Sequence, residues 1–334
     1  MKAETSLKKA LPAISRVEAP TGRPIESYFE EAYRFARDYK LAAAGAVITL
    51  LFVLTAIFAP QLAPMDPDQV NARDALAPPG SLHLLGTDNQ GRDLLSRVIW
   101  GARMSLYISL AAILSSAIIG AFLGMFAAYY ERLDMWIMRL MDILLAFPAI
   151  IVALTIIAIL GNGVNNVVIA IAVYHVPQYA RLAQGLTLSV KQSTFVEAAV
   201  ATGNTDLAIM GRYILPNIMA PLIVQTTLLI PAAIMTAASL SFLGLGVPPP
   251  TAEWGSMLQN SLQWASLAPH VMIVPGLALM LVVFGFNVTG DGLRDAMDPR
   301  LNTSRRGIRA NRLNRVAGHR ASGATPSVIA PAAR

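Results

Sequence analysis

The sequence predicts an all-α polytopic membrane protein with six transmembrane helices. Of its 334 residues, 55% are hydrophobic and only 14% are charged, and the mean hydropathy is +0.53. A soluble domain carries roughly 25% charged residues, so most of this chain is too apolar for water. Uncharged apolar runs long enough to cross a hydrocarbon core of about 30 Å alternate with polar segments. The absence of cysteine excludes disulfides, thiol nucleophiles and thiolate metal sites.

The chain begins with a polar segment, residues 1–40, that holds eight Lys/Arg and six Asp/Glu. It is too long and too acidic for the start of a signal peptide. Inside it, residues 25–36 have the apolar spacing of an amphipathic helix. The first predicted span is an uncharged run of 20 residues, 41–60. The polar loop 61–103 follows, and its last part, 92–103, predicts an amphipathic helix along the membrane surface.

Five further apolar runs predict the remaining spans, at residues 104–130, 143–160, 164–180, within 217–245, and 270–288. In the second span, Gly120 and Gly124 form a small-xxx-small pattern, which indicates close contact with another helix. The third span contains Pro148. A second outer loop, residues 246–269, carries an amphipathic stretch that begins at Trp254.

The loop at residues 181–216 interrupts the apolar pattern. Thr194 and Glu197 have the spacing of a capping box, which predicts a short helix, and Gly203 is suited to end it. Asn204 is the predicted cap of a second short helix, which Pro216 closes. Taken alone, the pattern also fits a plain surface hairpin between two spans.

This loop resembles the cytoplasmic loop of ABC-importer permeases. The resemblance rests on the order of its residues: Glu-Ala-Ala is followed after three residues by Gly, and later by Leu-Pro. In that family the loop lies in a groove of the ATP-binding subunit. The resemblance therefore implies that coupling to the ATPase is carried by Glu197, Ala198, Ala199, Gly203, Asn204, Leu215 and Pro216.

Two more segments resemble the dipeptide/oligopeptide/nickel branch of these permeases, specifically the second, C-type member of the permease pair. The first, residues 85–97, reads L-G-T-D-x-x-G-R-D-x-x-S-R. The second, residues 290–300, reads G-D-x-L-R-D-x-x-D-P-R, and we expect it to cap the sixth span. The alternative for the outer segment is a membrane anchor without a binding role. The resemblance implies that an extracytoplasmic solute-binding protein docks at Gly86, Thr87, Asp88, Gly91, Arg92 and Asp93.

The resemblance covers about residues 41–301 and implies a type I importer arrangement, with the first helix and outer loop at 41–103 and the core permease domain at 104–300. It implies a bacterial inner-membrane protein that works with a second homologous permease, two ATP-binding subunits and the binding protein. The chain has no G-x-x-x-x-G-K-[ST] motif. We therefore expect no enzyme activity, cofactor or metal in this chain, with ATP and Mg held by the partner subunits.

The distribution of positive residues predicts the orientation. If the amino terminus lies on the inner side of the membrane, 22 Lys/Arg residues lie on that side and 4 on the outer side. Because positive residues collect on the cytoplasmic side, we expect both termini and the loop 181–216 to be cytoplasmic. Residues 301–334 are predicted to be a disordered basic tail. This tail is the main source of the net charge of +6, and nucleic-acid binding is not needed to explain it. Its positive charge is suited to contact with anionic lipid.

Other functions are weighed against the importer. A secondary carrier or channel would use Asn165, Tyr174, His175 and Gln178 as a polar path through proline-broken helices. Ion-coupled carriers keep ionisable groups at mid-depth, and here His175 stands alone. A membrane scaffold is a weaker alternative. Short peptides are the expected substrate, with nickel or another small solute as the alternative; two histidines on separate spans do not make a nickel ligand set.

Overall fold

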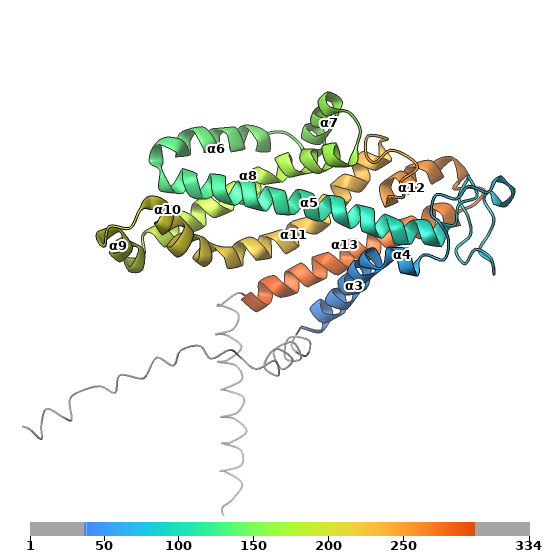
Figure 1. The fold of residues 1–334 in the computed structure, drawn as a ribbon, viewed down its shortest axis with the longest axis horizontal. Coiled ribbons are helices and arrows are strands. Elements are labelled where there is room, and N and C mark those ends of the chain that lie inside the picture. Colours follow the sequence, from blue (N-terminus) through green and yellow to red (C-terminus); the bar gives the residue numbers. More distant parts are fainter. Residues whose placement is uncertain (1–36, 38, 298–334) are drawn as a thin grey trace, which may run out of the picture. The chain divides into compact units, whose positions relative to one another are not determined.

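The computed structural model describes Arg37 and residues 39–297, and these are helical with no β-strand among them (Figure 1). The long helices are α3 (Lys40–Ile57), α5 (Leu94–Tyr129), α6 (Glu131–Leu145), α7 (Ala149–Leu160), α8 (Val164–Lys191), α11 (Leu215–Phe242) and α13 (His270–Met297). The short ones are α4 (Ala59–Leu62), η1 (Ala72–Asp74), α9 (Thr194–Ala201), α10 (Asp206–Ala208), η2 (Ile209–Ile214), α12 (Trp254–Ser261) and η3 (Leu262–Trp264). The predicted helix 25–36 and the predicted disordered tail 301–334 lie outside the described residues.

Helices α5 and α8 form the most extensive helix pair of the fold (Figure 1). Two glycines of α5 allow this contact, as the small-xxx-small pattern predicts. A Cβ atom at Gly124 would lie 2.0 Å from the carbonyl oxygen of Ala180, and one at Gly120 would lie 2.5 Å from Cβ of Tyr179. Because no other residue lacks a Cβ, only glycine allows the two backbones to approach this closely.

Three predicted element boundaries are wrong, each because a helix continues where the pattern suggested a break. The expected surface helix at 92–103 is the first part of α5, and its residues Leu94, Arg97 and Ala102 are buried. Helix α8 continues past the predicted end of the fourth span to Lys191. Helix α13 continues through the segment that was expected to cap the sixth span, as far as Met297.

The third predicted span is broken rather than straight. Helices α6 and α7 meet at an angle of 97° across the break that contains Pro148. The residue before proline is driven out of the helical conformation, and proline has no N–H to donate to the preceding turn. Pro148 therefore ends one helix and precedes the first residue of the next.

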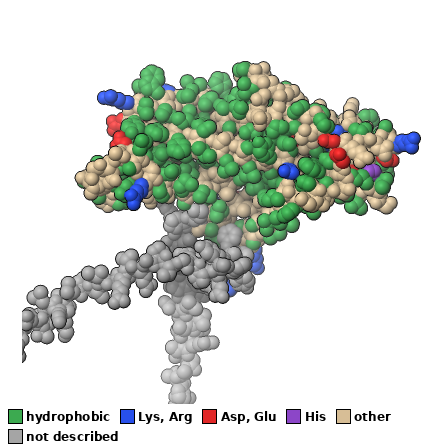
Figure 2. Space-filling view, in the orientation of Figure 1, with side chains coloured by type: hydrophobic (Ala, Val, Ile, Leu, Met, Phe, Trp, Pro, Cys, Tyr) green, Lys and Arg blue, Asp and Glu red, His purple; other side chains and the backbone are tan. Residues whose placement is uncertain are grey.

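Among the described residues, four helices are long and apolar enough to cross a membrane, or five if the bent pair α6 and α7 counts as one span. The predicted number of six is not confirmed as such. Helix α8 is long enough at 28 residues, but it carries polar side chains such as Asn165, His175 and Gln178 and is not among the four. Large apolar side chains remain exposed along α3, α5 and α13, and Figure 2 shows hydrophobic side chains covering most of the visible helical surface. Such a surface is suited to lipid.

Candidate functional site

The loop 181–216 is built around α9. The predicted capping box is wrong: Ser193, not Thr194, precedes the helix, and no side chain caps its first turn. The hydroxyl of Ser193 instead donates to the carbonyl of Val190, at the end of α8. The predicted stop at Gly203 is confirmed, because this residue has φ of +78° and its N–H donates to the carbonyl of Val200 at 3.0 Å. A residue with a Cβ is strained in that conformation.

The second predicted helix of the loop does not stand alone. Thr205 rather than Asn204 precedes α10, and the Asn204 amide instead donates to the carbonyl of Ala199 at 2.9 Å, which secures the end of α9. Pro216 does not close this helix. It lies in the first turn of α11, so that α10, the π-helical turn η2 and α11 make one helix, Asp206–Phe242.

The loop exposes apolar side chains at its surface. Ala199 and Val196 are buried, whereas Glu197 and Ala198 on the same helix are exposed. Around them, three large apolar side chains have exposed fractions of 45%, 55% and 68%: Phe195, Val200 and Leu207, which we call the loop patch. Of the other predicted coupling residues, Gly203, Asn204 and Pro216 are exposed and Leu215 is half-buried.

A polar anchor fixes this loop to the end of α5, and the sequence patterns did not reveal it. The hydroxyls of Tyr129 and Tyr130 donate to the two carboxylate oxygens of Asp206, at 2.9 and 3.2 Å. The ammonium of Lys191 donates to the carbonyl of Tyr129 at 3.1 Å and lies over its ring. The only signal in the sequence was a pair of tyrosines at the end of a span, which also fits a membrane-interface belt.

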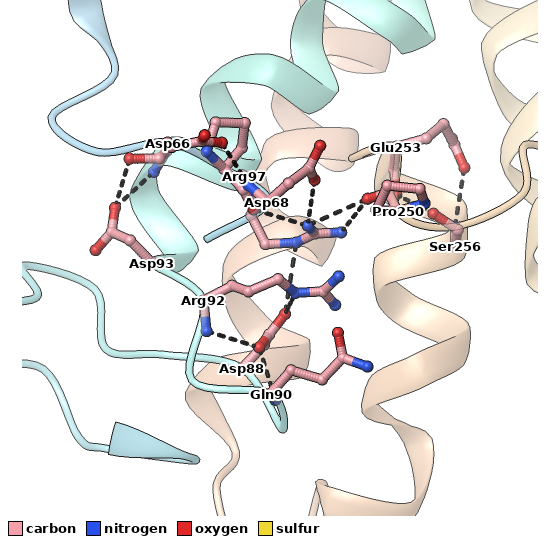
Figure 3. Close-up of polar contacts among 12 residues, drawn as sticks. Asp66, Asp68, Asp88, Gln90, Arg92, Asp93, Arg97, Pro250, Glu253 and Ser256 are labelled. Atoms are coloured by element: carbon pink, nitrogen blue, oxygen red, sulfur yellow. Dashed lines mark hydrogen bonds and ion pairs between the residues drawn. The ribbon is translucent and has the colours of Figure 1, made fainter. Parts of the chain in front are cut away.

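At the other end of the molecule, a buried ion-pair network joins the outer loops (Figure 3). Asp88 accepts from Nε of Arg92 at 2.7 Å and lies 3.5 Å from Nε of Arg97. Arg97 also pairs with Asp68 at 3.3 Å and donates to the carbonyl of Pro250 at 3.4 Å. Burial strengthens such charge-assisted bonds, and it makes the loss of any one partner costly. The network thereby holds the loop 61–93, α5 and the loop 246–253 together.

The remaining residues of the predicted docking segment also support the loop from inside. Asp93 precedes α5 and accepts from the N–H of Ser96 at 2.8 Å and from Nδ1 of His83 at 3.0 Å. The hydroxyl of Thr87 accepts from the N–H of Ala77 at 2.8 Å. Gly86 and Gly91 have positive φ and closely approach neighbouring backbone. All six predicted docking residues are thus buried within this chain.

The second outer loop is fixed by Glu253, whose side chain is fully buried. This carboxylate accepts from the N–H groups of Gly255 and Ser256, both at 2.9 Å, and from the hydroxyl of Ser105 at 3.3 Å. It thereby caps α12 and joins it to α5. Burial raises the pKa of the Glu253 carboxyl, and the backbone hydrogen bonds oppose part of this rise.

The polar residues of the predicted carrier path come from one helix. Asn165, Tyr174, His175 and Gln178 all lie on α8. Asn165 is exposed near its start, while His175 is buried in contact with the ring of Tyr174, with centroids 5.2 Å apart. Within the described part of the chain, no group of three or more His, Asp or Glu is placed to hold a metal ion.

Comparisons with known proteins agree with this architecture. Residues 119–303 match the family described as binding-protein-dependent transport system inner membrane component, and residues 27–79 match the N-terminal TM domain of oligopeptide transport permease C. The dipeptide transport system permease protein DppC of Alkalihalophilus pseudofirmus is 44% identical over 83% of this chain and 91% of its own length. The glutathione transport system permease protein GsiD of Pectobacterium atrosepticum is 44% identical over 81% of this chain and 90% of its own. The chain therefore belongs to the ABC-importer permeases, as a multi-pass inner-membrane subunit of a family that works with ATP-binding subunits and a binding protein.

Proposed function

We propose that this chain is one of two homologous permeases through which an importer moves di- or oligopeptides into the bacterial cell. The observation that carries the proposal is the 44% identity, over about nine tenths of their length, to permeases named for dipeptide and glutathione transport. Glutathione is itself a tripeptide, so the two names share a chemical class. Two ATP-binding subunits complete the complex and hydrolyse ATP with Mg, and this chain contributes the path and the coupling.

Coupling is proposed to occur at the inner loop. The loop patch exposes three large apolar side chains, two on α9 with Glu197 and one on α10, and exposed apolar side chains in a loop of this kind support a contact with another protein. Asp206, held by two tyrosine hydroxyls, fixes the position of the loop relative to α5. A push on α9 by the ATP-binding subunit therefore reaches α5 and the helix that contains α11, and shifts the permease between inward- and outward-facing states.

The orientation follows from this proposal. The loop patch has to meet a cytoplasmic ATPase, so the loop 181–216 and both termini are cytoplasmic. The outer loops then face the binding protein. Because Asp88, Arg92 and Asp93 are buried, their proposed role is to hold the shape of the docking surface rather than to touch the partner.

The test is uptake of labelled alanyl-alanine by cells that carry the complete importer, with nickel uptake measured in parallel. We expect Glu197→Lys to abolish peptide uptake, because it reverses the charge on the exposed face of α9. Gly203→Ala should reduce it, because the left-handed conformation costs a Cβ-bearing residue roughly 1–2 kcal/mol. Gly185→Ala on α8 is the matched control: it too has open space around it, but its φ is not positive.

Unchanged uptake by Glu197→Lys and Gly203→Ala, at normal membrane levels, would disprove the coupling role. Nickel uptake without peptide uptake by the wild-type complex would disprove the peptide assignment.

A further inference from the structure

A cavity of about 750 Å³ opens at the outer end of the molecule, and it shares Asp68 with the ion-pair network. It is bounded by the segment after α4, by the first turns of α5, and by residues 251–252. Its volume falls in the range of roughly 300–1,000 Å³ that is typical of small-molecule sites.

One wall of the cavity carries an unpaired positive charge. The guanidinium of Arg103 lies 5.6 Å from the ring centroid of Trp100, and it forms no ion pair with any described residue. A cation–π contact of this kind positions the guanidinium while its N–H groups stay free to donate. Arginine in this state is suited to bind a carboxylate with two parallel hydrogen bonds.

The opposite charge comes from the segment after α4. One carboxylate oxygen of Asp66 accepts from the N–H of Asp68 at 2.9 Å, and Asp66 forms no ion pair with a described residue. Its neighbour Asp68 differs, because that carboxylate is paired with Arg97. A free carboxylate and a free guanidinium therefore line the same cavity without pairing with each other.

Aromatic surface completes the lining. Trp100, Arg103 and Tyr107 follow one another at intervals of three and four residues, which places them on one face of α5. The exposed fraction of Tyr107 is 54%, which is high for a large aromatic side chain. Rings at such a position supply apolar contact area and a hydroxyl for a ligand.

We propose that this cavity is an outer binding subsite for a short zwitterionic peptide. Arg103 binds the terminal carboxylate, Asp66 binds the terminal ammonium, and Trp100 with Tyr107 contacts the peptide side chains. The inference rests on the proposed function and deepens it, since it places a contact for the peptide on this chain between the binding protein and the membrane path.

The geometry favours a peptide over a phospholipid headgroup of similar charge. Asp68 and residues 251–252, which form two walls of the cavity, belong to the two outer loops. Arg97 joins these loops, because it pairs with Asp68 and donates to the carbonyl of Pro250. The cavity therefore lies at the docking end, where a released peptide first meets the permease. A lipid headgroup is the alternative that the experiment has to separate.

The experiment measures binding of labelled alanyl-alanine to the complete permease–ATPase complex in lipid nanodiscs, without the soluble binding protein. Two capped forms of the probe, the N-acetylated and the C-amidated dipeptide, each remove one terminal charge. We expect Arg103→Gln and Asp66→Asn each to weaken binding of the free dipeptide at least about tenfold, as expected for loss of a charge-assisted bond. We also expect Arg103→Gln to bind the free and amidated forms equally, and Asp66→Asn to bind the free and acetylated forms equally.

Arg73→Gln is the matched control, because it removes an exposed positive charge from the same outer loop but outside the cavity lining. Binding that is absent in the wild type, or unchanged in both cavity variants, would overturn the inference. So would displacement of the dipeptide by phosphatidylethanolamine but not by phosphatidylglycerol in the nanodisc, because it would identify a lipid site. If wild-type cells import no peptide at all, the proposed function fails; if they import peptide and the cavity variants bind normally, only the subsite fails.

Discussion

Replacement of Gly124 by alanine tests the central contact of the fold. The added methyl group would meet the Ala180 carbonyl oxygen at 2.0 Å and Cβ of Ala183 at 2.9 Å, against at least 3.4 Å for an ordinary contact. The nearest atom belongs to the backbone, so no side chain can rotate away, and α5 and α8 have to separate. Overpacking of this kind costs about 1–3 kcal/mol, and the better helix propensity of alanine offsets at most about 1 kcal/mol of it.

The matched control is Gly185→Ala on α8, where an added Cβ meets nothing within 4 Å. Gly185→Ala gains the higher helix propensity of alanine, and no steric clash opposes this gain. The assay is thermal unfolding of the detergent-solubilised protein, followed by the fraction that stays monodisperse. We expect Gly124→Ala to unfold a few degrees below Gly185→Ala, since 1 kcal/mol shifts the midpoint by roughly 2–4 °C in chains of about 150–250 residues and by less in a longer one. Equal midpoints for the two variants would refute the argument that close backbone approach holds this helix pair.

Three further predictions concern the polar contacts. Arg97→Met should destabilise the protein by roughly 3 kcal/mol, as measured by chemical unfolding. This is the low end of the cost of breaking a buried ion pair, because Arg92 still pairs with Asp88 in the variant. Asp206→Asn should lower peptide uptake several-fold while leaving the membrane level normal, because the two hydroxyls use different carboxylate oxygens and one of these becomes an NH2 group that cannot accept; full uptake would exclude the anchor. Burial raises the pKa of Glu253, so the folded state favours the protonated carboxyl. The free energy of unfolding should therefore fall as the pH rises from 4.5, the ordinary pKa of this group, through the raised pKa of the folded state. Glu253→Gln should remove this dependence on pH.

The sequence predicted the features that depend on local pattern. The apolar runs located the long helices, the small-xxx-small spacing identified Gly120 and Gly124, and Gly203 was recognised as a helix stop because its conformation is a property of one residue. The family resemblance rested on equally local motifs, and the comparisons confirm it.

What could not be predicted depends on partners that are distant in the chain. Arg97 meets the carbonyl of Pro250 across 153 positions, and Tyr129 meets Asp206 across 77. Without these contacts, Arg97 was assigned to the polar face of a surface helix, although its side chain is buried. The ion pairs of the docking segment could not be predicted for the same reason: the motif of Asp and Arg residues does not show that Asp88 pairs with Arg92 and Arg97 inside the loop.

The unbroken helix from Asp206 to Phe242 gives the protein a lever. Its 37 residues extend for roughly 55 Å at 1.5 Å per residue. A rigid tilt of about 5° at the loop end would therefore move the far end by on the order of 5 Å. The π-helical turn η2 lies one turn from the anchored carboxylate of Asp206, and such turns widen a helix and recur at functional positions. In the coupling that we propose, this turn is the pivot, and the length of one helix would convert a small movement at the ATPase into a displacement as wide as a peptide backbone.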